Sequence, residues 1–354
     1  MDPGASGRGG RGAVKVLIVK LSALGDVVQS LPVAMAIHRQ NREVQVDWLV
    51  EQPSAGLLPG HPALTRVLVS PRHAITEGDG EPIQEVKDFI HVLREVKYDA
   101  VVDLQGLMKS AILVALSRGR RKIGFRGGKE FLAAWAYNQR LEPYDPDRPA
   151  WQRYLDLLGP LGFEQPARVE FGLEPSQGER KRVRSLLGGE GEQPLVVLHP
   201  MAKWDSKLWP LRYWVDLAQR LAQSGARLAL TGSADDQPLG RLIARRAGLG
   251  PALLDLTGRT GLKELAALLS LARLVVCTDT GVMHLAAAVG ARVVALFGPT
   301  APWRTGPFGS GHLVLRANLE CSPCFDRDCP EPICMQRLEP AQVAAAASSL
   351  LEQA

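Results

Sequence analysis

The sequence predicts an α/β protein of two domains, each built around a doubly wound parallel sheet. Short apolar runs alternate with amphipathic helical segments through most of the 354 residues, the order expected when crossover helices join parallel strands. Some runs are almost continuously apolar, as in strands buried on both faces, including residues 274–277 and 292–297. A chain of this length exceeds one ordinary hydrophobic core, which favours two domains.

The first half carries the elements of one such sheet. We expect strands there at residues 14–20, 44–50, 67–69 and 100–103. We expect helices at residues 27–37, 83–96, 108–116 and 151–161. The loop after the first strand reads LSALG, with a single glycine. A dinucleotide-binding turn would carry a glycine-rich fingerprint at this position, so the sequence argues against a nicotinamide cofactor.

The second half repeats the alternation of strands and helices. The expected elements are strands at 196–198, 227–230, 274–277 and 292–297, and helices at 211–224, 262–271, 283–289 and 341–351. A charged, glycine-rich segment with a helix at 179–187 joins the halves. We therefore divide the chain into a disordered tail at 1–13, a first domain at 14–175, a linker at 176–193, a second domain at 194–340 and a closing helix at 341–354.

The composition limits the class of protein. Hydrophobic residues make up 46% of the chain and charged residues 22%, as in soluble globular proteins. No apolar run approaches the ~20 residues needed to cross a bilayer, and the Gly/Arg-rich start lacks the apolar core of a signal peptide. We therefore expect a cytoplasmic protein. The net charge of +5 suits an acidic ligand, nucleic acid or an anionic membrane surface.

The stretch from Leu274 to Thr300 predicts a strand, a turn, a helix and a second strand. The helix would begin at Thr280-Gly281, where free N–H groups and the helix dipole favour an anion and glycine permits close approach of a phosphate. Asp279 could cap this helix or hold a sugar hydroxyl, and His284 lies one turn further on. The alternative is a capping aspartate and a histidine that only packs.

Four stretches of the chain recur together in one known family of enzymes. They read VKVLIVKLSALGDVVQSLP, DLQGLMKSA, HPMAKWDSKLWP and DTGVMHLAAAVGARVVALFGPT. In this order they resemble glycosyltransferase family 9, the heptosyltransferases of lipopolysaccharide core synthesis. The resemblance covers almost the whole chain and implies a GT-B architecture, in which two Rossmann-like domains face each other across a cleft. It also implies that the first domain binds the acceptor, the second binds the nucleotide sugar, and the closing helix crosses back to the first.

The resemblance implies an inverting, metal-independent transfer of heptose from ADP-heptose to a lipid A–core acceptor. Two alternatives stay open: another nucleotide sugar or acceptor within the family, or a nucleotide-sugar-binding protein without catalysis. The presence of both Asp26 and Lys207 argues against loss of catalysis. Nucleic acid is not expected as a partner, because no stacking aromatic residues accompany the basic cluster.

Site residues follow from the matched motifs. Asp26 would be the general base, although an aspartate at a helix start can also be a simple cap. The other matched positions would bind the donor: Lys207, Asp279, Thr280, Gly281 and His284 at the sugar and phosphates, Asp236 at the ribose and Thr260 near the base. For a lone lysine or a carboxylate at a helix start, a solvated side chain is the alternative.

No metal or cofactor is expected for the reaction. Asp235-Asp236 lacks the Asp-x-Asp spacing of metal-dependent transferases. A cluster near the C-terminus, Cys321, Cys324, Cys329 and Cys334, leaves two interpretations open. The thiols are structural, reduced or in disulfides, or they bind zinc or an iron–sulfur cluster, with spacing irregular for zinc.

Basic residues gather in the second quarter of the chain. Given the family's anionic, lipid-linked acceptor, we expect acceptor or inner-membrane contacts from Lys109, Arg120, Arg121, Lys122 and Arg126. This would make the protein peripheral on the cytoplasmic face of the inner membrane. The alternative is a solvated basic loop.

Overall fold

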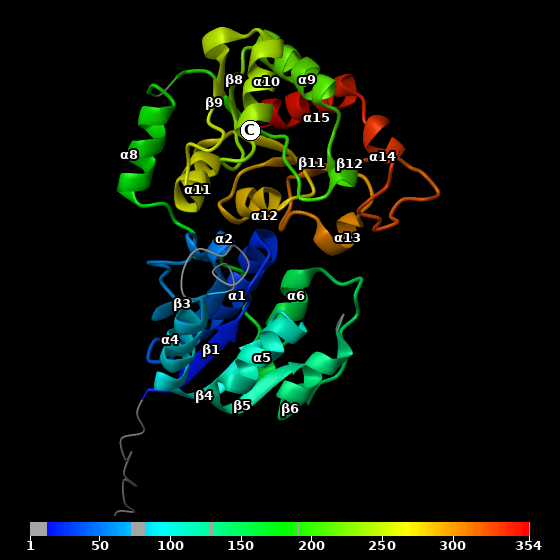
Figure 1. Ribbon diagram of the computed structural model, residues 1–354. Helices are drawn as coiled ribbons and strands as arrows, with labels where there is room; N and C mark the ends of the chain where they lie inside the picture. Colours follow the sequence, from blue (N-terminus) through cyan, green and yellow to red (C-terminus); the bar gives the residue numbers. More distant parts are fainter. Residues whose placement is uncertain (1–12, 72–81, 128–129, 190, 354) are drawn as a thin grey trace, which may run out of the picture. The chain divides into compact units, whose positions relative to one another are not determined.

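The structure is a computed structural model that describes residues 13–71, 82–127, 130–189 and 191–353 (Figure 1). The chain forms two compact units. The second unit comprises Leu173–Ala354 together with Ala23–Gln29 and Pro146–Ala150, and the first comprises the other residues up to Gly172. Nearly all of the expected N-terminal tail lies outside the described residues. Within them, no helix is both long enough and apolar enough to span a bilayer.

The first unit contains a parallel six-stranded sheet of order β3-β2-β1-β4-β5-β6. Its strands are β1 (Lys15–Val19), β2 (Gln45–Glu51), β3 (Arg66–Ser70), β4 (Lys97–Asp103), β5 (Arg118–Phe125) and β6 (Gln139–Leu141). The helices are α1 (Leu24–Gln40), α2 (Gln52–Ala55), α4 (Pro82–Glu95), α5 (Met108–Leu116), the 3₁₀ helix η1 (Phe131–Ala136), α6 (Ala150–Leu155) and α7 (Leu158–Leu161). The α1 helix begins within the segment that belongs to the second unit.

The second unit contains a parallel six-stranded sheet of order β12-β11-β10-β7-β8-β9. Its strands are β7 (Leu195–His199), β8 (Arg227–Leu230), β9 (Leu253–Asp255), β10 (Leu274–Thr278), β11 (Val293–Phe297) and β12 (Leu313–Arg316). The helices are α8 (Gln177–Leu186), η2 (Asp205–Lys207), α9 (Leu211–Gln223), α10 (Gln237–Ala247), η3 (Gly250–Ala252), α11 (Leu262–Leu271), α12 (Gly281–Ala288), α13 (Pro302–Thr305), α14 (Ile333–Gln336) and α15 (Pro340–Glu352).

The two sheets share one topology, which confirms the predicted fold class. In each sheet the second and third strands of the chain lie on one side of the first strand. The fourth, fifth and sixth strands lie on its other side. The order reverses between β1 and β4 in the first sheet and between β7 and β10 in the second. In open α/β sheets, ligands bind outside the carboxyl ends of the strands at this switch point. In the second unit, the topology therefore indicates a ligand site at the loops after β7 and β10.

The closing helix α15 packs within the second unit. Its apolar residues Val343, Ala347 and Leu350 repeat at helical spacing and are buried in the core of the second unit. There α15 packs against α9, and it also contacts β10 and β11. This packing accounts for the apolar face of α15, and a crossing of the helix to the first domain stays a prediction.

Three strands, β5, β6 and β12, were not predicted from the sequence. β5 has the sequence RGRRKIGF, in which charged residues hide the apolar alternation. β6 and β12 are only three and four residues long. The predicted helix at 151–161 is divided into α6 and α7. By contrast, α8 begins as expected of a capping box, because Ser176 and Glu179 each accept the other's backbone N–H.

Candidate active site

The turn after β10 opens α12 as predicted. Thr280 is the extended N-cap residue, its side chain makes no cap hydrogen bond, and the helix begins at Gly281. The first N–H groups of a helix have no intrahelical acceptor, and the helix dipole adds partial positive charge there. Thr278, at the end of β10, has a buried hydroxyl with no hydrogen-bond partner in the described part of the chain. The geometry suits an anionic ligand at the start of α12.

Asp279 does not cap the helix but holds Lys207. Its Oδ2 accepts a hydrogen bond from Lys207 Nζ at 2.7 Å and from Thr300 Oγ1 at 2.6 Å. Both charged side chains are largely buried, with 14% of the lysine side chain and 7% of the aspartate side chain exposed. Lys207 Nζ also lies 4.2 Å from the ring centroid of Trp204. Lys207 Nζ also donates to the backbone carbonyl of Asp279 at 3.4 Å, so these contacts fix the ammonium beside the start of α12.

His284 is buried on α12 beside the same turn. Its Nε2 lies 3.3 Å from the amide nitrogen of Gln29, while its Nδ1 has no hydrogen-bond partner among the residues that the structure describes. Burial lowers the pKa of His284; the charges of Asp279 and Asp26 raise it and that of Lys207 lowers it further. The ring is therefore neutral at pH 7 and presents one unused nitrogen.

Asp26 lies in the first turn of α1, within the second unit. Its Oδ2 accepts the N–H of Ala23 at 3.4 Å, a long hydrogen bond that corresponds to a weak cap. The neighbouring glycines permit close approach: a Cβ on Gly25 would lie 2.6 Å from Cδ2 of His284, and one on Gly281 would lie 2.9 Å from the backbone nitrogen of Gly25. The structure therefore brings the first turn of α1 against the start of α12, with Asp26 close enough to His284 to affect its titration.

Asp236 and Thr260 lie further along the carboxyl edge of the second sheet. Asp236 follows β8, and its Oδ2 accepts both the N–H and the hydroxyl of Ser233, so this carboxylate closes its own turn. Thr260 lies between β9 and α11. Two strand spacings, about 10 Å, separate β9 from β7, the strand that precedes Lys207. Thr280 follows β10, one strand beyond β7, so three strand spacings, about 14 Å, separate its strand from the strand that precedes Thr260.

The five basic residues assigned to the acceptor do not form one cluster. Lys109 Nζ bonds to Ser22 and to Glu51, which neutralises its charge. On β5, Lys122 donates to a carbonyl of α5, whereas Arg121 points to the other face and donates to Gln139 and the carbonyl of Pro160. The other two, Arg120 and Arg126, are exposed. Successive side chains of a strand point to opposite faces of the sheet, so β5 separates Arg121 from Lys122. This strand was not predicted from the sequence.

The cysteines are all free, and Cys277 is buried in β10 as expected. Of the C-terminal four, Cys334 is buried and Cys321 and Cys324 are exposed. In the described ranges, no group of three or more His, Cys, Asp and Glu residues is arranged to hold a metal. Backbone bonds from Cys324 and Phe325 to the carbonyl of Pro299 instead tie this segment to the turn that carries Thr300.

Sequence reasoning did not identify three polar residues of the site. Thr300 and Gln29 contact Asp279 and His284, respectively. His199 ends β7, and its Nδ1 lies 3.0 Å from Thr231 Oγ1. The only sequence signal was position: His199 ends the apolar strand β7, and Thr300 lies three residues after the end of the apolar strand β11.

Two doubly wound parallel units, each with its strand order reversing at a central switch point, are the architecture of GT-B glycosyltransferases. The model of glycosyltransferase family 9 (heptosyltransferase) matches residues 86–334. Lipopolysaccharide heptosyltransferase 1 of Pseudomonas aeruginosa is 32% identical, over 96% of this chain and 98% of the relative. The enzyme of the same name from Escherichia coli is 32% identical over 87% and 95%. This chain therefore belongs to glycosyltransferase family 9.

A solved structure agrees with this assignment. The structure of E. coli heptosyltransferase WaaC with ADP is similar to this chain with a TM-score of 0.79 and 28% identity. The similarity covers 95% of this chain and all of the solved one. The predicted family and enzyme class are thus confirmed.

Proposed function

We propose that this protein transfers heptose from ADP-heptose to a lipid A–core acceptor during assembly of the lipopolysaccharide inner core. The observation that carries the proposal is the convergence of Asp26, His284 and the Lys207–Asp279 pair at the start of α12. The names of the relatives support the reaction, and the ligand of the similar solved structure, ADP, supports the nucleotide. A further solved structure of that protein contains ADP-2-deoxy-2-fluoro heptose.

The chemistry would be a single displacement with inversion. Asp26 takes the proton of the acceptor hydroxyl, whose oxygen then attacks the anomeric carbon. The bond from that carbon to the diphosphate oxygen breaks, and ADP leaves with the electron pair. The start of α12 and the ammonium of Lys207 stabilise the charge that develops on the diphosphate. The neutral ring of His284 supplies its unused nitrogen to the sugar or phosphate.

In this proposal the second unit binds the nucleotide sugar. The diphosphate lies at Thr280 and Gly281, and the nucleoside extends along the carboxyl edge toward Asp236 and Thr260. The first unit binds the lipid-linked acceptor, with Arg120 and Arg126 as the exposed charges of the basic set. The protein acts at the cytoplasmic face of the inner membrane.

The donor is tested by thermal shift with ADP-, GDP-, UDP- and dTDP-sugars. We expect ADP-heptose and ADP to raise the unfolding temperature at concentrations at which the other nucleotides do not. A response confined to another nucleotide would keep the family and replace the donor. No response to any nucleotide, with the folded state intact, would reject the proposed donor site.

Metal independence has its own test, because helix N–H groups and Lys207 take the place of a divalent ion in the proposal. We expect turnover of ADP-heptose to continue in EDTA. Loss of turnover that magnesium or manganese restores would show that the reaction needs a metal. Metal content measured before and after chelation separates this effect from any metal bound by the C-terminal cysteines.

A further inference from the structure

η1 exposes three large apolar side chains to water. Phe131 is 72% exposed, Leu132 57% and Trp135 54%, within a helix of six residues. Single exposed hydrophobic residues are ordinary on protein surfaces, but adjoining ones in so short a segment mark a contact surface. We call these three residues the η1 apolar surface.

The local geometry explains why these side chains point outward. A 3₁₀ helix has three residues per turn, so residues three apart share one side. Ala133 and Ala136 form the side that is buried in the core of the first unit, which packs η1 against α5. Leu132 and Trp135 form another side, which the core does not cover. The small alanines bring η1 close to the core, and the large residues stay in solvent.

Hydrogen bonds anchor the chain on both sides of η1. Before the helix, the carboxylate of Glu130 accepts the N–H of Met108 at the start of α5. After it, the hydroxyl of Tyr137 donates to the buried carboxylate of Asp103 at 2.7 Å, and the Tyr137 ring lies where a Cβ on Gly124 would be. These contacts tie both ends of η1 to the first unit, with its large side chains on the outer side.

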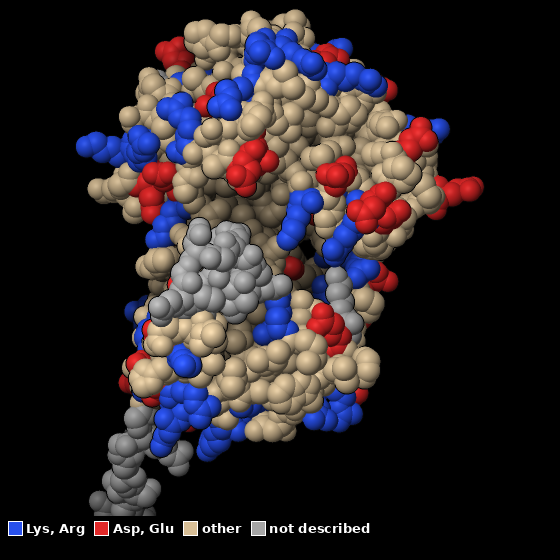
Figure 2. All heavy atoms as spheres, in the orientation of Figure 1, with Lys and Arg blue, Asp and Glu red and all other residues tan. Residues whose placement is uncertain are grey.

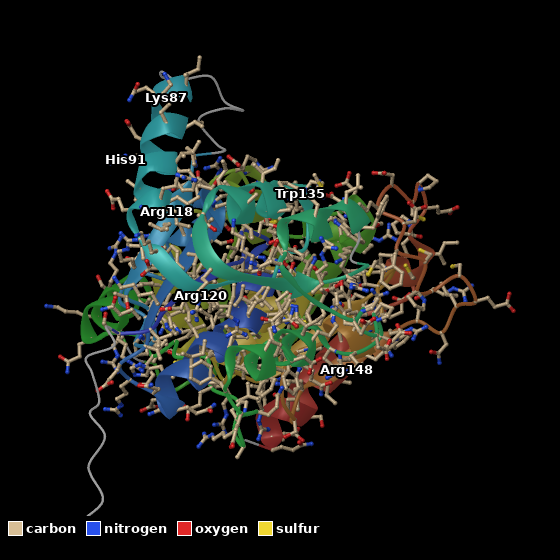
Figure 3. The ribbon with its side chains drawn as sticks, turned by 90° about the horizontal axis from the view of Figure 1, so that it is seen from below. Lys87, His91, Arg118, Arg120, Trp135 and Arg148 are labelled. Carbon is tan, nitrogen blue, oxygen red and sulfur yellow. The ribbon has the colours of Figure 1, made fainter. Side chains whose placement is uncertain are left out.

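Positive charge lies beside this surface. The chain that leaves η1 runs along β5, because the side chain of Asn138 bonds to backbone groups of Arg120 and Lys122. Arg118 and Arg120 are exposed on the same face of that strand. Figure 3 shows them on β5 together with Trp135 on η1, on the side of the first unit seen from below. Figure 2 shows a mainly uncharged surface over α5, with Lys and Arg atoms at its lower border.

We propose that the η1 apolar surface and the neighbouring arginines of β5 dock the protein onto an anionic phospholipid bilayer. Tryptophan, phenylalanine and leucine enter the interfacial layer, while arginine pairs with lipid phosphates. A second copy of this chain is a poorer occupant, because a symmetric contact would bring the arginines of both copies together. The inference rests on the proposed function in one respect: a lipid-linked acceptor gives the enzyme a reason to work at a bilayer.

The test is sedimentation of the full chain with vesicles of phosphatidylethanolamine and phosphatidylglycerol in equal parts. We expect binding that falls with added salt and with replacement of phosphatidylglycerol by phosphatidylcholine. The triple variant Phe131→Ser/Leu132→Ser/Trp135→Ser should bind about tenfold more weakly or worse. The variant Arg118→Gln/Arg120→Gln should lose most of the dependence on anionic lipid. The matched control, Trp303→Ser/Ile333→Ser, removes exposed apolar side chains from α13 and α14 and should bind like wild type.

Several outcomes would overturn the proposal: no vesicle binding by wild type, equal binding by the triple variant, or conversion of a wild-type dimer to a monomer by that variant without loss of vesicle binding. Titration with ADP shows separately that each variant is folded and keeps its donor site. Transfer to a deacylated, water-soluble acceptor should be unchanged in the triple variant. Vesicle binding without ADP binding would reject the proposed donor and leave the membrane surface in place.

Discussion

The ammonium of Lys207 and the carboxylate of Asp279 form a largely buried pair, with 2.7 Å between Nζ and Oδ2. The two residues follow β7 and β10, the neighbouring strands between which the order of the second sheet reverses. A buried pair of this kind is costly to break, because loss of one partner leaves the other charge uncompensated. Here the pair also fixes a positive charge next to the start of α12.

Lys207→Ala should weaken the binding of ADP by about one to two decades, because a charged hydrogen bond contributes roughly 1.5–3 kcal/mol. Because the buried carboxylate of Asp279 would lose its partner, we expect the loss of ADP affinity to lie nearer two decades than one. Lys207→Arg should restore affinity only in part, because a planar guanidinium does not replace a compact ammonium. Calorimetric titration measures this, with Lys203→Ala, an exposed lysine of the same loop, as the control. An unchanged dissociation constant for Lys207→Ala would exclude Lys207 from the donor site.

Thr300→Val should reduce ADP affinity less than Lys207→Ala does. The hydroxyl of Thr300 donates to the same oxygen of Asp279 that holds Lys207, so valine removes one of the bonds that orient the carboxylate. A neutral hydrogen bond contributes about 1 kcal/mol, which corresponds to roughly a fivefold loss. Thr300→Ser keeps the hydroxyl and should bind like wild type. Equal affinities for the valine and serine variants would show that Thr300 does not orient the pair.

Asp26→Asn should keep the fold and the affinity for ADP but lose turnover by about 10²–10⁴-fold, the usual cost of removing a general base. The side-chain oxygen of asparagine can still accept the hydrogen bond from the N–H of Ala23, so the contact at the start of α1 is kept. The substitution therefore separates the two interpretations of this aspartate. Single-turnover rates with saturating donor measure the effect. Turnover near the wild-type rate would leave Asp26 as a helix cap.

Stability should fall as the pH is lowered, in part because of His199. Burial lowers the pKa of this histidine to about 4, against the partly opposing effects of Asp236 and Thr231. Between about pH 6.5 and about pH 4 the unfolded chain binds a proton that the folded chain does not, so the free energy of unfolding decreases with falling pH. The full effect is about 3 kcal/mol at 1.36 kcal/mol per pKa unit.

Urea unfolding of wild type and His199→Gln across this pH range measures the effect. The variant should show a shallower loss of stability on acidification, whatever its stability at neutral pH. Parallel curves for the two proteins would mean that His199 takes up its proton in the folded state as readily as in the unfolded chain.

The sequence by itself determined the α/β class, the strands of both switch points and the place of the turn that opens α12. These features depend on local patterns: continuous apolar runs for buried strands, and Thr280-Gly281 directly after one of them. The sequence also identified Asp26, Lys207 and His284 as candidate site residues, because each lies in a short motif of the family. The basic strand β5 was not predicted, because its charged residues interrupt the apolar alternation on which strand prediction depends.

Only the tertiary structure decided which of these residues touch. Asp279 was expected to cap a helix or hold a sugar, yet it bonds Lys207, which lies 72 positions away, and Thr300, which lies 21 positions away. Gln29 meets His284 across 255 positions. Such contacts are set by the order of strands in the sheet and by glycines that let two turns approach, and neither leaves a periodic signal in the chain. Likewise, the outward side of η1 became visible only when Ala133 and Ala136 were seen in the core, because burial is a property of the packed fold.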